Sequence, residues 1–268
     1  MSNRILAPLC VLLASTPALA DERRDDGCGG VLGLEAAPAT PRSGERLEYE
    51  LRFEGAYMGR LELTVGEPRS LGGALALPLF GRLRTSSMVA AIKAVEGRYM
   101  AMVDPATLMP FGVKVEALVG EDDRWEDVRF LERGREAETR FLFRGKESRR
   151  RYGASHPMLE GLSLLHFARR VPLEPGLSAC QDILSTRRVW RVRAEVLGRE
   201  TVQTPVGPKP AYRVRTAFTR RERGAKRPTL AMDILLGDMP GRPPLAFEMR
   251  QKRFSGKASL VRWKPGRG

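Results

Sequence analysis

The sequence predicts a mainly β protein whose antiparallel strands curl into an open barrel or sandwich, with one short helix between two strand sets. Short segments in which apolar and polar residues alternate recur along the chain, as is typical of strands with one face in water. Gly, Pro and Asp bound these segments at the spacing of hairpins. Only one segment has clear helical spacing, which argues against a parallel sheet built from βαβ units.

The first twenty residues have the layout of a cleavable secretory signal peptide. Arg4 precedes an apolar stretch over residues 5–14, about half of the ~20 residues that a membrane-spanning helix needs. Ala18-Leu19-Ala20 provides small side chains for a signal peptidase, so we expect cleavage between Ala20 and Asp21. The alternative, a buried N-terminal helix, does not explain this cleavage pattern. We expect a periplasmic or secreted protein with no membrane span in its mature chain.

Residues 21–44 are rich in Gly, Pro and Asp without periodicity, and we expect them to form an extended arm. Cys10 lies in the signal, so Cys28 and Cys180 are the cysteines of the mature chain. In an oxidising compartment a disulfide between them is the natural pairing, and closing so long a loop contributes about 4 kcal/mol. Two free thiols remain the alternative, because sequence spacing does not place the two Cα atoms.

The first strand set begins at Arg46. Leu47, Tyr49, Leu51 and Phe53 alternate with charged residues, and residues 61–65 repeat the pattern after Gly55, which predicts a hairpin with one wet face. Further strands of this set are expected at residues 74–86, 97–103, 111–119, 124–131 and 138–143.

A helix is expected over residues 159–170, where Leu162, Leu165 and Phe167 have helical spacing and Pro172 follows. A shorter helical turn is expected over residues 88–95. Strands resume after Gly176, at residues 190–196, 212–218, 229–236, 245–254 and 257–263. We expect residues 45–263 to form a single β domain, followed by a tail of residues 264–268.

The alternation places five aromatic side chains on the inner face of the sheet: Tyr49, Phe53, Trp190, Tyr212 and Phe218. They are the candidate lining of a ligand cleft. The alternative is an ordinary core, because close-packed interiors are the rule and alternation does not distinguish filled from empty space.

The chain is strongly basic, with a formal net charge of +14 at pH 7. The densest runs are Arg149-Arg150-Arg151 and the basic residues between 220 and 227, for which loop or strand-end positions are expected. A solvated surface explains much of this charge. For an exported protein it also favours anionic lipid, lipopolysaccharide or acidic glycan as partners, and not nucleic acid.

The sequence predicts no catalytic residue, metal site or cofactor. His156 and His166 lack the i, i+4 spacing of a metal pair, and Ser163 lies in the helical segment without the second glycine of a nucleophile elbow. Paired carboxylates stay open, with Glu116 and Glu248 as examples, because glycosidase acids need only be close in space. Non-enzymatic binding of a lipid-like or amphipathic ligand or partner is favoured, and a carboxylate-dependent hydrolase of envelope polymers is the alternative.

Four motifs follow one another along residues 44–262. They are Gly44-Glu45-Arg46-Leu47-Glu48-Tyr49-Glu50-Leu51 with Gly59 after it, Asp104-Pro105-Ala106-Thr107-Leu108-Met109-Pro110, residues 164–169 followed by Leu173 and Pro175-Gly176, and residues 200–207 followed by Ala211-Tyr212-Arg213-Val214. In this order they resemble the exported bacterial proteins known as domain of unknown function 3108. Met232-Asp233 and Pro243-Pro244-Leu245 only approximate that family's late strand. The resemblance implies export and an all-β fold, and it implies no catalytic residue.

Overall fold

The computed structural model describes residues 41–221, 230–251 and 254–267, which form a continuous 16-stranded sheet. Along the described chain the elements are β1 (Arg46–Phe53), β2 (Ala56–Val65), β3 (Arg69–Leu71), β4 (Ala74–Thr85), α2 (Ser87–Lys93), β5 (Val95–Val103), β6 (Pro110–Val119), β7 (Asp122–Leu131), the 3-10 turn η1 (Glu132–Gly134), β8 (Glu136–Phe143), β9 (Lys146–Gly153), β10 (Met158–Leu159), α3 (Gly161–Ala168), β11 (Ser178–Ser185), β12 (Arg188–Thr204), β13 (Gly207–Arg220), β14 (Leu230–Gly237), β15 (Pro244–Gln251) and β16 (Phe254–Lys264).

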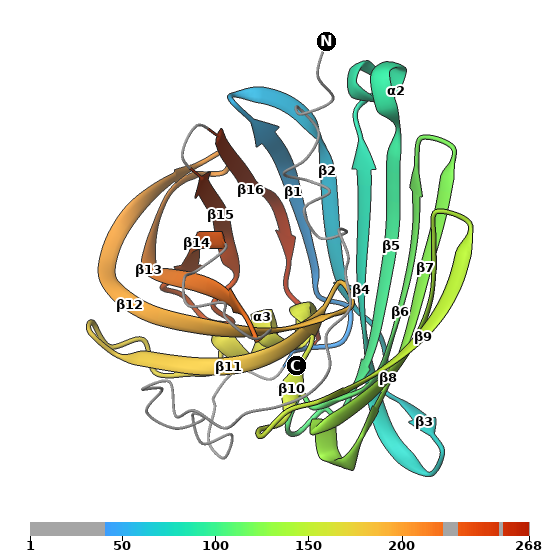
Figure 1. Cartoon of the computed structure of the whole chain (residues 1–268). Coiled ribbons are helices and arrows are strands. Elements are labelled where there is room, and N and C mark those ends of the chain that lie inside the picture. The colour runs from blue at the N-terminus through green and yellow to red at the C-terminus, as the bar shows by residue number, and fades with distance from the viewer. Residues whose placement is uncertain (1–40, 222–229, 252–253, 268) are drawn as a thin grey trace.

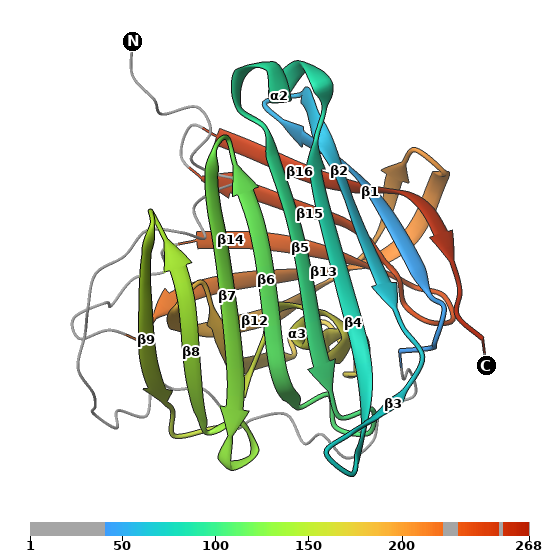
Figure 2. The same ribbon diagram turned by 90° about the vertical axis from the view of Figure 1, so that its right-hand side faces the viewer.

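The sheet curls into two walls that face each other, and its two edges do not pair. Its strand order is β10-β11-β12-β13-β14-β15-β16-β1-β2-β4-β5-β6-β7-β8-β9, with β3 added to β4. One wall is formed by β4–β9 and the other by β11–β16, and α3 lies between them (Figure 1). Figure 2 shows β4–β9 upright in front of β12–β16, which run across behind them.

The predicted fold class is confirmed, including a helix between the two strand sets. Neighbouring strands pair antiparallel, except that the two-residue strand β10 runs parallel to β11. The predicted helical turn over residues 88–95 is α2, and the helix over residues 159–170 is α3. The signal peptide, most of the arm, Cys28, and residues 222–229 of the second basic run lie outside the described residues.

The prediction that Arg149-Arg150-Arg151 lies in a loop or at a strand end is wrong. These three residues lie within β9, at one edge of the sheet. Charged side chains are common on edge strands, because they discourage pairing with a further strand. Here alternation also makes Arg149 and Arg151 exposed and Arg150 partly buried, so the run has two distinct faces.

Two turns of the family motifs have the structural roles that their sequences indicate. Asp104 accepts hydrogen bonds from the backbone N–H groups of Ala106 and Thr107, at 2.8 and 2.9 Å, and so caps the turn between β5 and β6. The Thr204 hydroxyl donates to the Gly207 carbonyl at 2.7 Å, where β12 ends and Gly207 reverses the chain with a φ of +93°.

The sheet requires a glycine at position 59, the glycine that follows the first family motif. It lies in β2 between Leu51 of β1 and Thr85 of β4, with a φ of +153°. A Cβ at this position would lie 2.1 Å from the Arg84 carbonyl oxygen. Only glycine allows β2 and β4 to approach each other so closely here.

We therefore expect Gly59→Ala to lower the free energy of unfolding by about 2–4 kcal/mol, because the new methyl group forces the two backbones apart. Urea denaturation followed by circular dichroism measures this. Gly153→Ala in β9 is the matched control, since a Cβ there meets nothing within 4 Å, and it should change stability by less than about 1 kcal/mol. Equal denaturation midpoints for the two variants would contradict the argument.

Candidate functional site

The helix α3 begins at a buried carboxylate. Glu160 is its N-cap residue and accepts hydrogen bonds from the backbone N–H groups of Leu162 and Ser163 and from the Tyr99 hydroxyl of β5. Burial raises the pKa of Glu160 above its ordinary value, although these donors counteract the effect. Burial also raises the pKa of Tyr99, and the nearby Glu160 carboxylate adds to this rise. The hydrogen bonds thus fix the start of α3 against the β4–β9 wall.

A buried ion pair fixes the other end of α3. Arg169 donates to both carboxylate oxygens of Glu45, at 2.9 and 2.7 Å, and to the Gly241 carbonyl oxygen. The Trp263 indole N–H also donates to Glu45, at 3.1 Å. The end of α3 is thereby joined to residues at the beginning and the end of the described chain.

His166 belongs to this polar network. Its Nδ1 lies 3.0 Å from the Arg169 guanidinium, which can only donate, so Nδ1 accepts. Burial lowers the pKa of His166 well below its ordinary value, and the charges of Arg169 and Arg170 lower it further. The imidazole is therefore neutral, with its proton on Nε2.

Next to α3 the inner face of the sheet is filled. One row of cross-strand partners crosses β2, β4, β5, β6, β7 and β8, and every member is at most 5% exposed: Val65, Leu79, Ala101, Val113, Val128 and Thr139. The apolar members of this row pack with Phe167 of α3 in the largest core cluster. The interior at this level has the close packing of an ordinary core.

Four residues further along the strands, the same face is open. The corresponding row is Leu61, Leu83, Gly97, Ala117 and Arg124, and each of these residues is only partly buried. The row between them is mixed, since Leu63 and Gly81 are buried whereas Tyr99, Val115 and Glu126 are not fully buried. Burial thus decreases from α3 toward the end of the wall that carries α2. We call Leu61, Leu83, Gly97 and Ala117 the open apolar row.

A small cavity lies on the other side of α3. Its volume is about 60 Å³, and the side chains that line it are almost entirely apolar, among them Phe167, Leu173, Val192, Val214 and Leu236. Ligand pockets for small molecules generally have volumes of ~300–1,000 Å³. This cavity is therefore too small to hold an acyl chain.

The five inward aromatic residues are not gathered at one place. Tyr49 is fully buried, Trp190 is 7% exposed in a different core cluster, and Tyr212 packs on a third. Phe53 stacks on Phe254 with 5.8 Å between ring centroids, and Phe218 packs against the cluster of Trp190. None of the five lines the small cavity. Their predicted role as one ligand-binding set stays a prediction.

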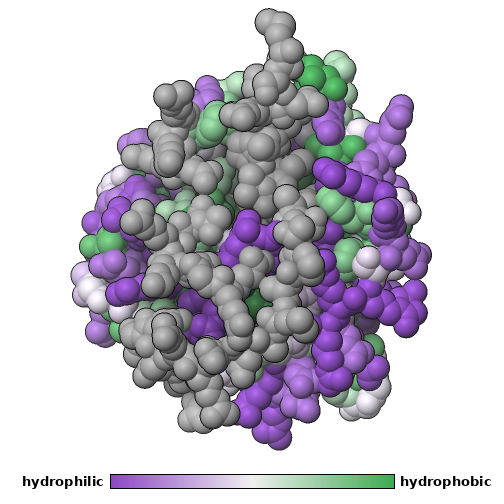
Figure 3. Space-filling model, viewed as in Figure 1, coloured by the Kyte–Doolittle hydropathy of each residue, from purple (hydrophilic) through white to green (hydrophobic). Residues whose placement is uncertain are grey.

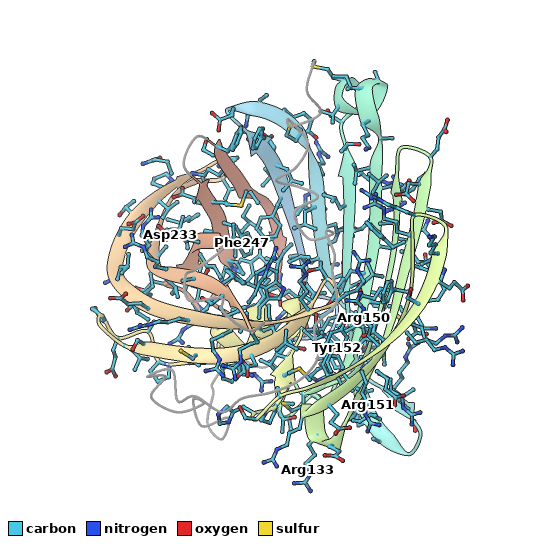
Figure 4. The ribbon with its side chains drawn as sticks, viewed as in Figure 1. Arg133, Arg150, Arg151, Tyr152, Asp233 and Phe247 are labelled. Carbon is cyan, nitrogen blue, oxygen red and sulfur yellow. The ribbon has the colours of Figure 1, made fainter. Side chains whose placement is uncertain are left out.

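A cluster of arginine and phenylalanine side chains lies beside the open apolar row. The Arg187 guanidinium is 4.2 Å from the Phe143 ring centroid and 4.9 Å from that of Phe141. Arg124 lies 4.9 Å from Phe143, and Arg150 lies 5.6 Å from Phe141. We call these three arginines and two phenylalanines the guanidinium cluster. In Figure 4, Arg150 and Tyr152 lie toward the middle of the molecule, whereas Arg151 and Arg133 lie on its outer side.

The backbone that carries Arg187 is strained. Arg187 and Thr186 form the two-residue turn between β11 and β12, and their φ angles are +63° and +51°. Such turns favour Asn and Gly, and a β-branched residue at positive φ is rare. The Tyr152 hydroxyl of β9 donates to the Arg187 carbonyl oxygen at 2.7 Å, which links the edge strand β9 of one wall to the β11–β12 turn of the other. The strained turn therefore lies where the two walls meet.

The guanidinium cluster contains a carboxyl group with an unusual pKa. Burial raises the pKa of Glu126 to about 7, although the Arg187 charge and its backbone N–H lower it. Arg124 forms an ion pair with Asp122, with 2.8 Å between its Nε and Oδ2. Near neutral pH the cluster therefore has more positive than negative charge.

Apolar side chains are also exposed at the end of the wall near the open apolar row. α2 has no buried residue, and Met88 and Ile92 are 79% and 83% exposed. It joins β4 to β5, beginning four residues after Leu83 and ending four residues before Gly97. Figure 3 shows apolar surface at this end of the molecule.

The structure places the predicted acidic residues on opposite walls. Glu116 is exposed on β6, and Glu248 of β15 forms ion pairs with Arg213 and Lys257. Ser163 lies within α3 and not on a strand-to-helix turn. Among the described residues, no group of three or more His, Cys, Asp or Glu side chains could hold a metal ion. No described helix has the length and apolar character to cross a bilayer.

The fold and the site define an all-β protein whose unclosed sheet surrounds one helix and leaves part of its inner face open. Residues 48–253 match the family described as "Protein of unknown function (DUF3108)", and the chain belongs to that family. The resemblance that the sequence motifs indicate is thus confirmed. No curated protein sequence matches the chain.

A solved structure with a similar fold supports the architecture. A crystal structure described as a beta-barrel-like protein of domain of unknown function DUF1849 from Brucella abortus is 12% identical, covers 85% of this chain and 100% of its own, and superposes with a TM-score of 0.58. A candidate lipoprotein from Parabacteroides distasonis and a candidate exported protein with a YmcC-like fold from Bacteroides fragilis each cover 85% of this chain and 99% of their own. They are 10% and 11% identical, with TM-scores of 0.35 and 0.33.

Glu126 gives a testable pH dependence. Its folded pKa of about 7 exceeds the ordinary value of 4.5, so the folded state binds more protons between these pH values and loses stability as pH rises through them. Glu126→Gln removes the ionisation. The variant should therefore gain stability relative to the wild type between pH 5 and pH 8, by about 2–3 kcal/mol.

Urea denaturation at several pH values measures this difference. Asp127→Asn, at the adjacent exposed position of β7, is the control and should follow the wild-type pH profile. Parallel pH profiles for the wild type and Glu126→Gln would show that the Glu126 pKa is not raised.

Proposed function

We propose that this protein is a non-enzymatic binding protein of the bacterial envelope that holds a lipid-like, amphipathic ligand on the inner face of its sheet. The observation that carries the proposal is the open apolar row, where an apolar wall is left partly exposed although the same face is densely packed next to α3. Exposed apolar surface that is continuous with a core is unusual in a protein without a ligand or partner.

The dimensions of the wall suit an acyl chain. From Leu61 to Arg124 the row crosses four pairs of adjacent strands, and at about 4.8 Å for each pair it extends over about 19 Å. Gly97 and Ala117 in its middle have little or no side chain, and a Cβ at Gly97 would have no neighbour closer than 3.8 Å. The middle of the row therefore has less side-chain volume than its Leu61 and Leu83 end. An extended hydrocarbon chain fits such a surface better than a compact solute does.

Binding can be tested with N-phenyl-1-naphthylamine, a neutral dye whose fluorescence increases in apolar surroundings. Ala117→Phe places a ring on the open apolar row and should weaken dye binding at least tenfold, because it fills the space that the ligand uses. The free energy of unfolding should change by less than about 1.5 kcal/mol, since the position is not packed.

Leu118→Phe is the matched control for this experiment. Leu118 is the next residue of β6, lies on the opposite face and is 44% exposed, so the same introduced ring should leave dye binding unchanged. A wild-type protein that does not bind the dye, or equal binding by the two variants, would refute the proposed site. If Ala117→Phe instead unfolds the protein, the row is part of the packed core.

Export and the disulfide are part of the same proposal. They rest on the signal pattern of residues 1–20 and on Cys180 of β11, whose proposed partner Cys28 lies outside the described residues. We expect envelope-derived protein to begin at Asp21 and to be 2 Da heavier after reduction, as a single disulfide requires. Intact-mass spectrometry with and without reductant measures both. Two thiols that react with iodoacetamide before reduction would contradict the pairing.

A further inference from the structure

We propose that the guanidinium cluster of Arg124, Arg150 and Arg187 binds the anionic head group, phosphate or carboxylate, of the amphipathic ligand. This inference rests on the proposed function and adds the chemical class of the ligand, an anionic lipid with an apolar tail. The position of Arg124 is the first argument. It pairs with Ala117 at the end of the open apolar row, so a tail that lies along this row ends beside the cluster.

The local charge is the second argument. Four guanidinium groups lie within 5.6 Å of the Phe141 or Phe143 ring centroid, those of the cluster and that of the exposed Arg144. The nearby carboxylates are Asp122, already paired with Arg124, and Glu126. Burial disfavours the charged form of Arg187, which is only 5% exposed, and so lowers its pKa. Glu126 and Tyr152 counteract this effect, and repulsion from Arg150 and Arg124 adds to it. An anion with two or three acceptor oxygens relieves this repulsion. Guanidinium groups bind phosphate and carboxylate oxygens through paired N–H donors.

The backbone is the third argument. Positive φ angles at Thr186 and Arg187 are each unfavourable, and they hold Arg187 against Phe141 and Phe143. A turn whose only role were to reverse the chain would tolerate Asn and Gly, which adopt these angles readily. This turn instead contains Thr186 and Arg187 in an unfavourable backbone conformation, and Arg187 faces the interior. Strain of this kind is concentrated at binding sites.

Displacement of bound N-phenyl-1-naphthylamine separates the head group from the tail. The competitors are 1-oleoylglycerol, oleate, 1-oleoyl lysophosphatidate and inorganic phosphate, each used below its aggregation concentration. The wild type should bind one or both anionic lipids about tenfold more tightly than the neutral 1-oleoylglycerol. Preference for lysophosphatidate indicates a phosphate head group, and preference for oleate a carboxylate. Competition by inorganic phosphate would show that the cluster also binds the free anion.

Adjacent arginines of β9 provide matched variants. Arg150→Gln removes a charge from the cluster and should abolish the preference for anionic lipid over 1-oleoylglycerol. Arg150→Lys should restore part of the preference. Arg149→Gln makes the same change in net charge on the exposed face of the same strand and should have no effect. Thermal unfolding of each variant establishes that it is folded.

The two levels of the proposal fail in different ways. Equal affinity of the wild type for neutral and anionic lipids, or equal effects of Arg149→Gln and Arg150→Gln, would overturn the head-group inference and leave the apolar site intact. The arginines would then only pack on the phenylalanine rings. If the wild type binds neither the dye nor 1-oleoylglycerol, the proposed function itself fails.

Discussion

The arrangement of the interior depends on the buried ion pair between Arg169 and Glu45. Burial of two charges is unfavourable unless hydrogen bonds satisfy both groups, and here Arg169 contacts Glu45, Gly241 and His166 while Glu45 also accepts from Trp263. These partners come from parts of the chain far apart in sequence, so only one placement of α3 satisfies all of them. With its other end held by Glu160, α3 occupies one level of the interior, and no helix among the described residues covers the inner face beyond it.

The difference between the two levels comes from side-chain size and charge. The row beside α3 consists mainly of apolar side chains that pack closely together. The row toward α2 has Gly97 and Ala117 at its middle and Arg124 at its end. Larger apolar residues at these positions would fill the space and stabilise the fold. Local departures from optimal packing and from relaxed backbone geometry tend to coincide at functional sites, and here the strained Thr186-Arg187 turn lies beside the unfilled row.

Periodicity predicted the strands that bury one face, and the structure shows why it missed others. Residues 47–53 alternate cleanly, and their apolar side chains are at most 9% exposed. β9 was missed because its sequence, KESRRRYG, has almost no apolar residue, and its edge position permits that composition. The candidate site was missed for a related reason. Nothing within Arg149-Arg150-Arg151 shows that only the middle residue faces inward, because that depends on the register of β9 with β8. Arg169 and Glu45 are 124 residues apart, a separation at which no local pattern pairs them.

Location decides what each positive charge of this basic chain does. Many arginines on the outer surface are already neutralised, as Arg213 is by Glu200, Asp233 and Glu248. The charge of an exposed arginine such as Arg149 is surrounded by water and salt. At 0.1 M ionic strength its interactions with charges more than about 10 Å away are largely screened. Arg187 is shielded by two aromatic rings, so its field is less screened and falls on the inner face of the sheet. Under the proposed function, the overall charge of +14 would contribute general attraction to anionic surfaces, whereas selection of one anionic molecule would depend on the few arginines inside.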